Sequence, residues 1–156
     1  MKISIKDMKR EYGVEIAKWE YEDAYAFYNH DADFKDECMD GNHFAFFNEK
    51  DELIGYMCFG VEARIPTTER AVYSDDYLDI GLHIKPDYTG KKLGSTFIKT
   101  AYDFALATYN TNKLRATIAS FNHRAIKLCI NNGFEVLQEI AHRVSGVKFT
   151  IVVSTL

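Results

Sequence analysis

Apolar residues recur along this chain at two spacings. Alternation with a period of two predicts a strand, and recurrence every three to four residues predicts an amphipathic helix. Strands are predicted at residues 2–5, 43–48, 53–62, 77–84, 114–120, 134–144 and 147–153. Helices are predicted at residues 8–19, from residue 93 to about residue 110, and at residues 123–132, with one or two more within residues 20–40. Mostly antiparallel strands with helices between them indicate an α/β (α+β) fold in a single domain, residues 1–156.

The strand at residues 77–84 leads into a turn that carries glycine and lysine, with the sequence KPDYTGKKLGS. Gly90 permits a backbone conformation that a side chain would forbid, and Gly94 lets a ligand approach the first turn of the next helix. Lys91 and Lys92 add positive charge beside the positive end of the helix dipole. These features suit the pyrophosphate of a coenzyme. A plain strand-to-helix turn with exposed lysines accounts for the same residues, and the turn alone does not decide between the two.

The helix predicted at residues 123–132 has clear ends. Asn122 is a good N-cap, and Phe121 and Ile126 stand where the two residues of a hydrophobic staple belong. Gly133 follows the last helical residue, where a left-handed residue commonly ends a helix.

Composition and charge narrow the class of protein. The chain has 156 residues, of which 47% are hydrophobic and 27% charged, as in ordinary globular domains. A net charge of -4 argues against nucleic-acid binding and against an anionic membrane surface. The chain has three cysteines, Cys38, Cys58 and Cys129. Because their number is odd, we expect no disulfide framework, and we expect the protein to reside in a reducing compartment. No signal segment or membrane-length apolar run is seen, so we expect a cytoplasmic protein.

Residues 20–40 mix five aromatic residues with a dense set of acids. One interpretation is an amphipathic helix or two with a solvated acidic face, since runs of charge are usually surface. The other is an aromatic and acidic wall that selects a cationic substrate. The loop expected at residues 63–76 could border the same site.

A second motif, NHRAIKLCINNGF, follows the turn after an intervening helix and strand. Together, IKPDYTGKKLGS and NHRAIKLCINNGF resemble the GNAT superfamily of acetyl-CoA-dependent N-acetyltransferases, and DIGLHI with PDYTG resembles one bacterial subgroup. The resemblance implies a mixed, mostly antiparallel sheet of six to seven strands with helices on both faces. The central strands at residues 77–84 and 114–120 would splay apart to admit the pantetheine arm.

The resemblance also implies the reaction and the residues that bind the coenzyme. Acetyl-CoA would give its acetyl group directly to a primary amine of a small acceptor, which is expected to be cationic, and coenzyme A would leave. The oxyanion would be held by a backbone N–H of the strand, and the pyrophosphate by the turn. The coenzyme-binding residues implied are Leu82, His83, Ile84, Thr89, Gly90, Lys91, Lys92, Leu93, Gly94, Ser95, Asn122 and Ala125.

The sequence departs from the family pattern at three positions. Thr89 stands where Gln or Arg is usual, and Lys92 stands where the first signature Gly is usual. Cys129 occupies the position of a Tyr that is often credited with protonating the departing thiolate. Cys129 could replace that Tyr as a thiol acid, carry the acetyl group covalently, or be a small buried hydrophobe.

The reaction also needs a base, because a primary ammonium has a pKa near ~10 and must lose a proton before it attacks a thioester. Asp79 lies where family members often carry a carboxylate that acts through water as this base. A structural hydrogen bond at a strand edge is an equal alternative for Asp79. Asp79 and Cys129 are therefore the two catalytic candidates, and no metal is predicted because the histidines lack ligand spacing.

Two rival functions and one assembly stay open at this point. A protein or peptide N-terminal acetyltransferase and a non-catalytic acyl-CoA-binding sensor both suit the same motifs. The apolar strand VKFTIVVSTL would be an edge for a homodimer if it is left uncovered. A small-molecule amine is the expected partner, with no nucleic acid and no membrane.

Overall fold

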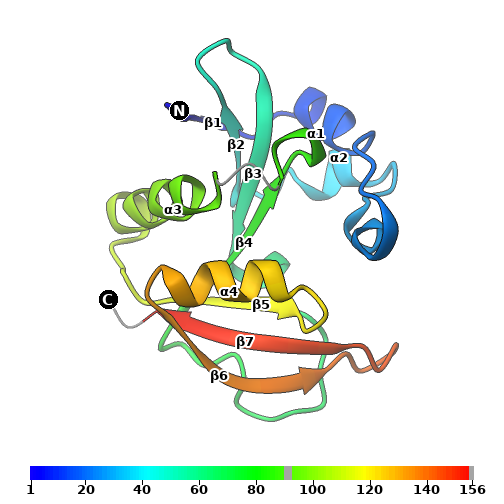
Figure 1. Cartoon of the computed structure of the whole chain (residues 1–156), viewed down its shortest axis with the longest axis vertical. Coiled ribbons are helices and arrows are strands. Elements are labelled where there is room, and N and C mark those ends of the chain that lie inside the picture. Colours follow the sequence, from blue (N-terminus) through cyan, green and yellow to red (C-terminus); the bar gives the residue numbers. More distant parts are fainter. Residues whose placement is uncertain (90–92, 155–156) are drawn as a thin grey trace. The chain divides into compact units, whose positions relative to one another are not determined.

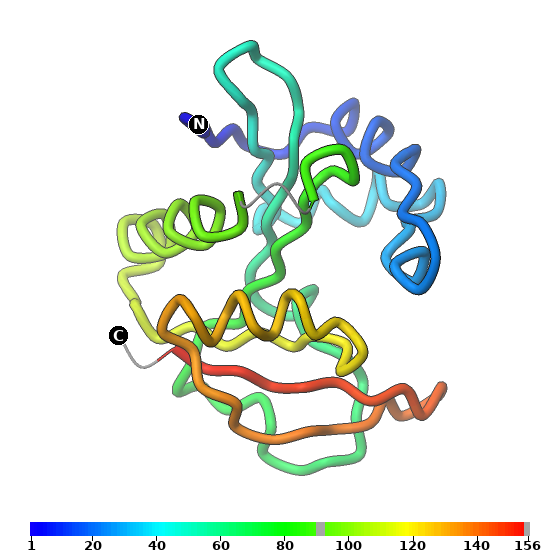
Figure 2. The backbone as a smooth tube through the Cα atoms, viewed as in Figure 1, coloured from blue at the N-terminus to red at the C-terminus, as the bar shows by residue number. Residues whose placement is uncertain are grey.

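Seven strands form a sheet in the order β1-β2-β3-β4-β5-β7-β6 in the computed structural model, which describes residues 1–89 and 93–154 (Figure 1). The chain divides into two compact units, and Figure 2 traces its path through both. The first unit comprises Met1–Cys58 and Leu82–Phe97, and the second comprises Phe59–Gly81 and Ile98–Leu156. The predicted mixed, mostly antiparallel sheet is confirmed, while a single domain over residues 1–156 stays a prediction.

The first unit is built on three antiparallel strands: β1 (Ser4–Asp7), β2 (His43–Phe47) and β3 (Leu53–Phe59). Every residue of β2 and β3 is buried, as their continuous apolar runs predict. The predicted strand at residues 53–62 is too long, because Gly60 takes a positive φ of 86° and begins the short 3-10 helix η2 (Gly60–Ala63).

The helices that precede β2 in the first unit are short. They are α1 (Arg10–Ile16), the 3-10 helix η1 (Asp23–Tyr28) and α2 (Phe34–Glu37). Gly13 allows α1 and α2 to pack closely, because a Cβ there would lie 2.7 Å from the Cys38 sulfur. The core of this unit is made by Met8, Ile16, Trp19, Phe34, Cys38, Ala45, Phe47, Leu53 and Tyr56.

Strand β4 (Leu78–Ile84) begins in the second unit and ends in the first. It pairs in parallel with β5 (Leu114–Ala119), with Leu78 opposite Leu114 and Asp79 opposite Arg115. After β4, the 3-10 helix η3 (Pro86–Tyr88) forms the beginning of the turn with the sequence KPDYTGKKLGS.

The second unit ends in two antiparallel strands, β6 (Phe134–Ala141) and β7 (Lys148–Ser154). Strand β7 pairs with β5 on one side and with β6 on the other. The C-terminal strand is therefore covered on both edges, and the condition on which the predicted dimer depended is not met. Strand β6 stands last in the strand order.

Two helices of the chain match the sequence prediction closely. Helix α3 covers Gly94–Tyr109, and helix α4 covers His123–Asn131. The Asn122 side chain caps α4 by accepting a hydrogen bond from the Ala125 N–H at 3.1 Å, and Gly133 ends it with a φ of 91°. Within residues 1–89 and 93–154, no helix has both the length and the apolar character needed to span a bilayer.

Candidate active site

Asp79 lies in the second unit in a buried ion-pair network with two arginines. Asp79 and Arg115 are each only 1% exposed, on neighbouring strands. Arg115 donates from Nε to Oδ1 at 2.7 Å and from Nη2 to Oδ2 at 2.8 Å, so it binds the carboxylate in a bidentate manner. Arg64, in the loop before β4, donates from Nε to Oδ2 at 2.8 Å.

The same arginines also hold the long loop that precedes β4. Arg115 donates to the carbonyl oxygens of Val72 at 3.1 Å and Ser74 at 3.0 Å. The guanidinium carbons of Arg64 and Arg115 lie 5.3 Å and 5.1 Å from the centre of the Tyr73 ring. The loop is thus anchored to the sheet of the second unit by charge-assisted hydrogen bonds.

These contacts bear on the two roles that the sequence leaves open for Asp79. Both carboxylate oxygens are taken by guanidinium donors, and almost no surface of the side chain reaches solvent. A base that works through water needs a carboxylate oxygen that water can reach. The geometry therefore favours the structural alternative, and base catalysis by Asp79 stays a prediction.

Cys129 is half-buried on α4. Burial raises the pKa of its thiol to about 12, so the thiol stays protonated at neutral pH. Because the thiolate is the nucleophilic form, this environment disfavours covalent acetyl transfer through Cys129. Packing and the donation of a proton are both compatible with a protonated thiol, and the role of Cys129 stays a prediction.

The predicted coenzyme-binding residues are divided between the units. Leu82, His83, Ile84, Thr89, Leu93, Gly94 and Ser95 belong to the first unit, and Asn122 and Ala125 belong to the second. Gly90, Lys91 and Lys92 lie outside the described residues. Helix α3 begins at Gly94, so Gly94 and Ser95 form its first turn as predicted. Coenzyme binding by all of these residues stays a prediction.

The first unit contains a cluster of histidine and aromatic rings that sequence analysis missed. Tyr56, 2% exposed, stands at its centre, with its hydroxyl 2.6 Å from Nε2 of His30. His83 of β4 stacks on the Tyr56 ring at 4.5 Å with an angle of 6° between the planes. Phe34 stacks on His30 at 4.0 Å, and His43 stacks on Tyr56 at 5.9 Å. Four separate segments supply these rings, so no spacing in the sequence signals the cluster.

The surroundings keep His30, His83 and Tyr56 uncharged near neutral pH. Burial, together with repulsion from His30 and His43, lowers the pKa of His83 to about 3. Burial is also the main cause that lowers the pKa of His30, whereas the charge of Asp31 acts in the opposite direction. Burial raises the pKa of Tyr56 well above its ordinary value. Two neutral imidazoles and a neutral phenol thus lie in contact.

Residues 21–28, which include η1, bring more aromatic rings to the last residues of β4. The Tyr21 hydroxyl donates a hydrogen bond to the carbonyl oxygen of Ile84 at 2.5 Å. The Tyr28 ring lies 6.4 Å from His83 and 5.3 Å from Phe27, between centroids. A line of rings therefore runs from η1 to the histidine cluster, within the segment for which an aromatic and acidic wall is one of the two interpretations.

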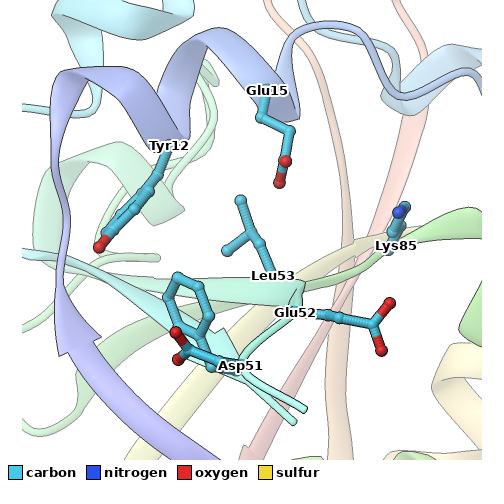
Figure 3. Close-up of a pocket in the computed structure, with 7 residues that line it drawn as sticks. Tyr12, Glu15, Asp51, Glu52, Leu53 and Lys85 are labelled. Atoms are coloured by element: carbon cyan, nitrogen blue, oxygen red, sulfur yellow. The ribbon is translucent and has the colours of Figure 1, made fainter.

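Two further features of the first unit contain none of the sequence-predicted site residues. Exposed Asp31, Asp33 and Glu37 place carboxylate oxygens within 4.8 Å of one another, an arrangement common on surfaces without a metal. A pocket also lies between α1 and the β2–β3 hairpin, and Figure 3 shows the Glu15 carboxylate turned toward Leu53. Its lining residues are Tyr12, Glu15, Phe47, Asp51, Glu52, Leu53 and Lys85.

The sequence matches the model of the acetyltransferase (GNAT) family over residues 10–134, and the chain belongs to this family. No curated protein matches the chain in a comparison of sequences. Among solved structures, the chain is similar to a chimera of the spermidine N-acetyltransferase SpeG from Vibrio cholerae and hSSAT. That match has 15% identity and a TM-score of 0.69, and it covers 99% of this chain and 95% of the other. A GNAT-family acetyltransferase from Bacillus anthracis matches with 12% identity and a TM-score of 0.74, covering 98% of this chain and 94% of the other.

Proposed function

We propose that this chain transfers the acetyl group of acetyl-CoA directly to a primary amine of a small cationic acceptor and releases coenzyme A. Membership of the acetyltransferase family supports the reaction type. Similarity in fold to a spermidine N-acetyltransferase is compatible with a cationic acceptor.

The observation that supports a cationic acceptor is the set of aromatic rings that contact the last residues of β4. Tyr21 and Tyr28 contact Ile84 and His83, in the part of the strand whose backbone is proposed to hold the thioester oxygen. Aromatic faces attract ammonium groups, and the acids of residues 20–40 add negative charge beside them. A small cation is therefore the acceptor that these side chains suit best.

In the proposed reaction the amine nitrogen attacks the thioester carbon, the carbon–nitrogen bond forms, and the carbon–sulfur bond breaks. The nitrogen loses two protons in total. One ends on the coenzyme A sulfur, and the other passes to solvent through a base of the protein.

The test is a measurement of free thiol released from acetyl-CoA with a panel of polyamines, aminoglycosides and short peptides. We expect turnover with polyamines or other small cations. Turnover confined to peptides would support an N-terminal peptide acetyltransferase. A rise in melting temperature with acetyl-CoA but no turnover would support the acyl-CoA sensor. No thermal shift with acetyl-CoA or coenzyme A at millimolar concentration would refute the coenzyme assignment.

A further inference from the structure

We propose that His30 accepts the proton that the acceptor ammonium must lose, and that Tyr56 holds the His30 ring in the required orientation. The inference rests on the proposed function, because it names the base of that same reaction. No motif or spacing in the sequence marks His30 as the base.

The position of His30 supports this role. Its ring belongs to the cluster that includes His83, at 5.8 Å between centroids, and His83 lies in the strand proposed to hold the thioester. His30 is half-buried, whereas Tyr56 is almost wholly buried. Of these two residues, only His30 has exposed surface that the amine substrate can reach.

The pair has the geometry of a base and its orienting group. The Tyr56 hydroxyl and Nε2 of His30 are 2.6 Å apart, and Phe34 stacks on the imidazole at 4.0 Å. With the Nε2 proton donated to the Tyr56 oxygen, Nδ1 carries the lone pair that takes the proton. Tyr56 is then a positioning residue, and it stabilises the imidazolium that forms.

The charges around His30 allow it to act at neutral pH. The groups that face it are Asp31 on its own segment, His43 from β2, Tyr56 from β3 and His83 from β4. Burial is the main cause that lowers the pKa of His30, Asp31 acts against it and His43 adds to it, so the imidazole is neutral and ready to accept a proton. Burial beside the same rings also lowers the pKa of an ammonium, which brings donor and acceptor closer in basicity.

The proton balance is complete without a further reactant. The ammonium gives one proton to Nδ1 of His30, and its neutral nitrogen attacks the thioester carbon. As the carbon–sulfur bond breaks, the second nitrogen proton leaves and the thiolate gains a proton. The imidazolium returns its proton to solvent before the next turnover.

The first experiment compares His30→Gln with wild type by thiol release from acetyl-CoA, with spermidine as the probe acceptor. We expect kcat/KM to fall by about 100-fold or more, because a positioned base contributes roughly that much. Thermal shift with coenzyme A should stay unchanged. His142→Gln, in the turn between β6 and β7, is the matched control and should keep wild-type activity.

The pH profile separates a base from a merely structural histidine. Wild-type kcat/KM should fall as pH drops through the pKa of His30, and this acid limb should vanish in His30→Gln. Added imidazole should restore activity to His30→Ala. An unchanged acid limb in His30→Gln, or activity within about threefold of wild type, would overturn the inference while leaving the acetyltransferase function in place.

Tyr56→Phe provides a second variant that keeps the packed ring and removes only the hydroxyl. Loss of the hydrogen bond that stabilises the imidazolium should move the acid limb to lower pH. An acid limb at the wild-type pH would overturn the role of Tyr56 even if His30→Gln fails to fold. No thiol release by wild type with any amine would refute the proposed function itself, and the inference with it.

Discussion

Replacing Asp79 by Asn tests whether the buried ion-pair network is structural. The substitution keeps the shape of the side chain but removes its charge. Arg115, 1% exposed, would then keep neutral acceptors, the carbonyl oxygens of Val72 and Ser74 and the one amide oxygen of the new side chain, but no charged partner. The new amide would also turn an N–H group toward the donors of Arg115 or Arg64.

The expected loss of unfolding free energy follows from the burial of the partner left behind. Removing one member of a buried ion pair costs about 3–5 kcal/mol, because the other charge stays buried without compensation. With a urea m-value of roughly 2 kcal/mol/M, the midpoint of unfolding should fall by about 1.5–2.5 M. Asp75→Asn, at an exposed position of the same loop, should change stability by less than about 0.5 kcal/mol.

A loss below about 1 kcal/mol in Asp79→Asn would refute the structural reasoning. If such a stable variant also lost turnover while still binding acetyl-CoA, Asp79 would be the base that the family resemblance implies. A double-mutant cycle with Arg115→Met refines the result. The two changes together should cost less than the sum of each alone, because the double variant no longer leaves the fully buried charge of Arg115 without its partner.

Three further predictions concern the stability of particular sites. Gly55→Ala would place a Cβ 2.6 Å from the carbonyl oxygen of His83, so β3 and β4 must shift, and melting should show a loss of about 1–3 kcal/mol. Because the folded pKa of His83 is about 3, below that of the unfolded chain, its contribution to stability declines as pH falls from about 6.5 to about 3. His83→Phe should remove this decline, of at most about 1.4 kcal/mol per pH unit, from urea midpoints measured across the range. Tyr102→Phe should leave the melting temperature unchanged or higher, because among the described residues the buried Tyr102 hydroxyl has no hydrogen-bond partner.

Each of these has a result that contradicts it. Wild-type stability in Gly55→Ala would mean that β3 and β4 can move apart enough to admit a Cβ at no cost. Identical pH dependence in His83→Phe and wild type would show that His83 titrates alike in both states. A fall in melting temperature by several degrees in Tyr102→Phe would reveal a hydrogen bond made by that hydroxyl.

The strands and the two long helices could be predicted because their signals are local. Asn122 and Gly133 mark the ends of α4 in the sequence and do so in the structure. The helix predicted at residues 8–19 is shorter because apolar spacing shows which residues face the core, not where helical hydrogen bonds stop. Met8 and Trp19 are both buried, yet Met8 donates its N–H to His43 on β2 and lies outside α1.

The parts of the candidate site that could be predicted are those whose residues are contiguous in the sequence. The turn into α3 and the cap of α4 are contiguous motifs, and both elements begin where expected. The partners of Asp79 are not contiguous with it, since the register of β4 against β5 brings Arg115 beside it. His30, Tyr56 and His83 likewise meet only after folding, so side-chain contacts alone identify them.

The strand order of the second unit has a consequence for how the chain is made. Strand β7 separates β5 from β6, so a strand that comes later in the chain than both is inserted between them. Until residues 148–154 emerge, β5 and β6 each keep an unpaired edge that can join another chain. Nascent chains stalled before β7 should therefore aggregate unless a chaperone covers these edges, and the second unit cannot complete its sheet until β7 has been made.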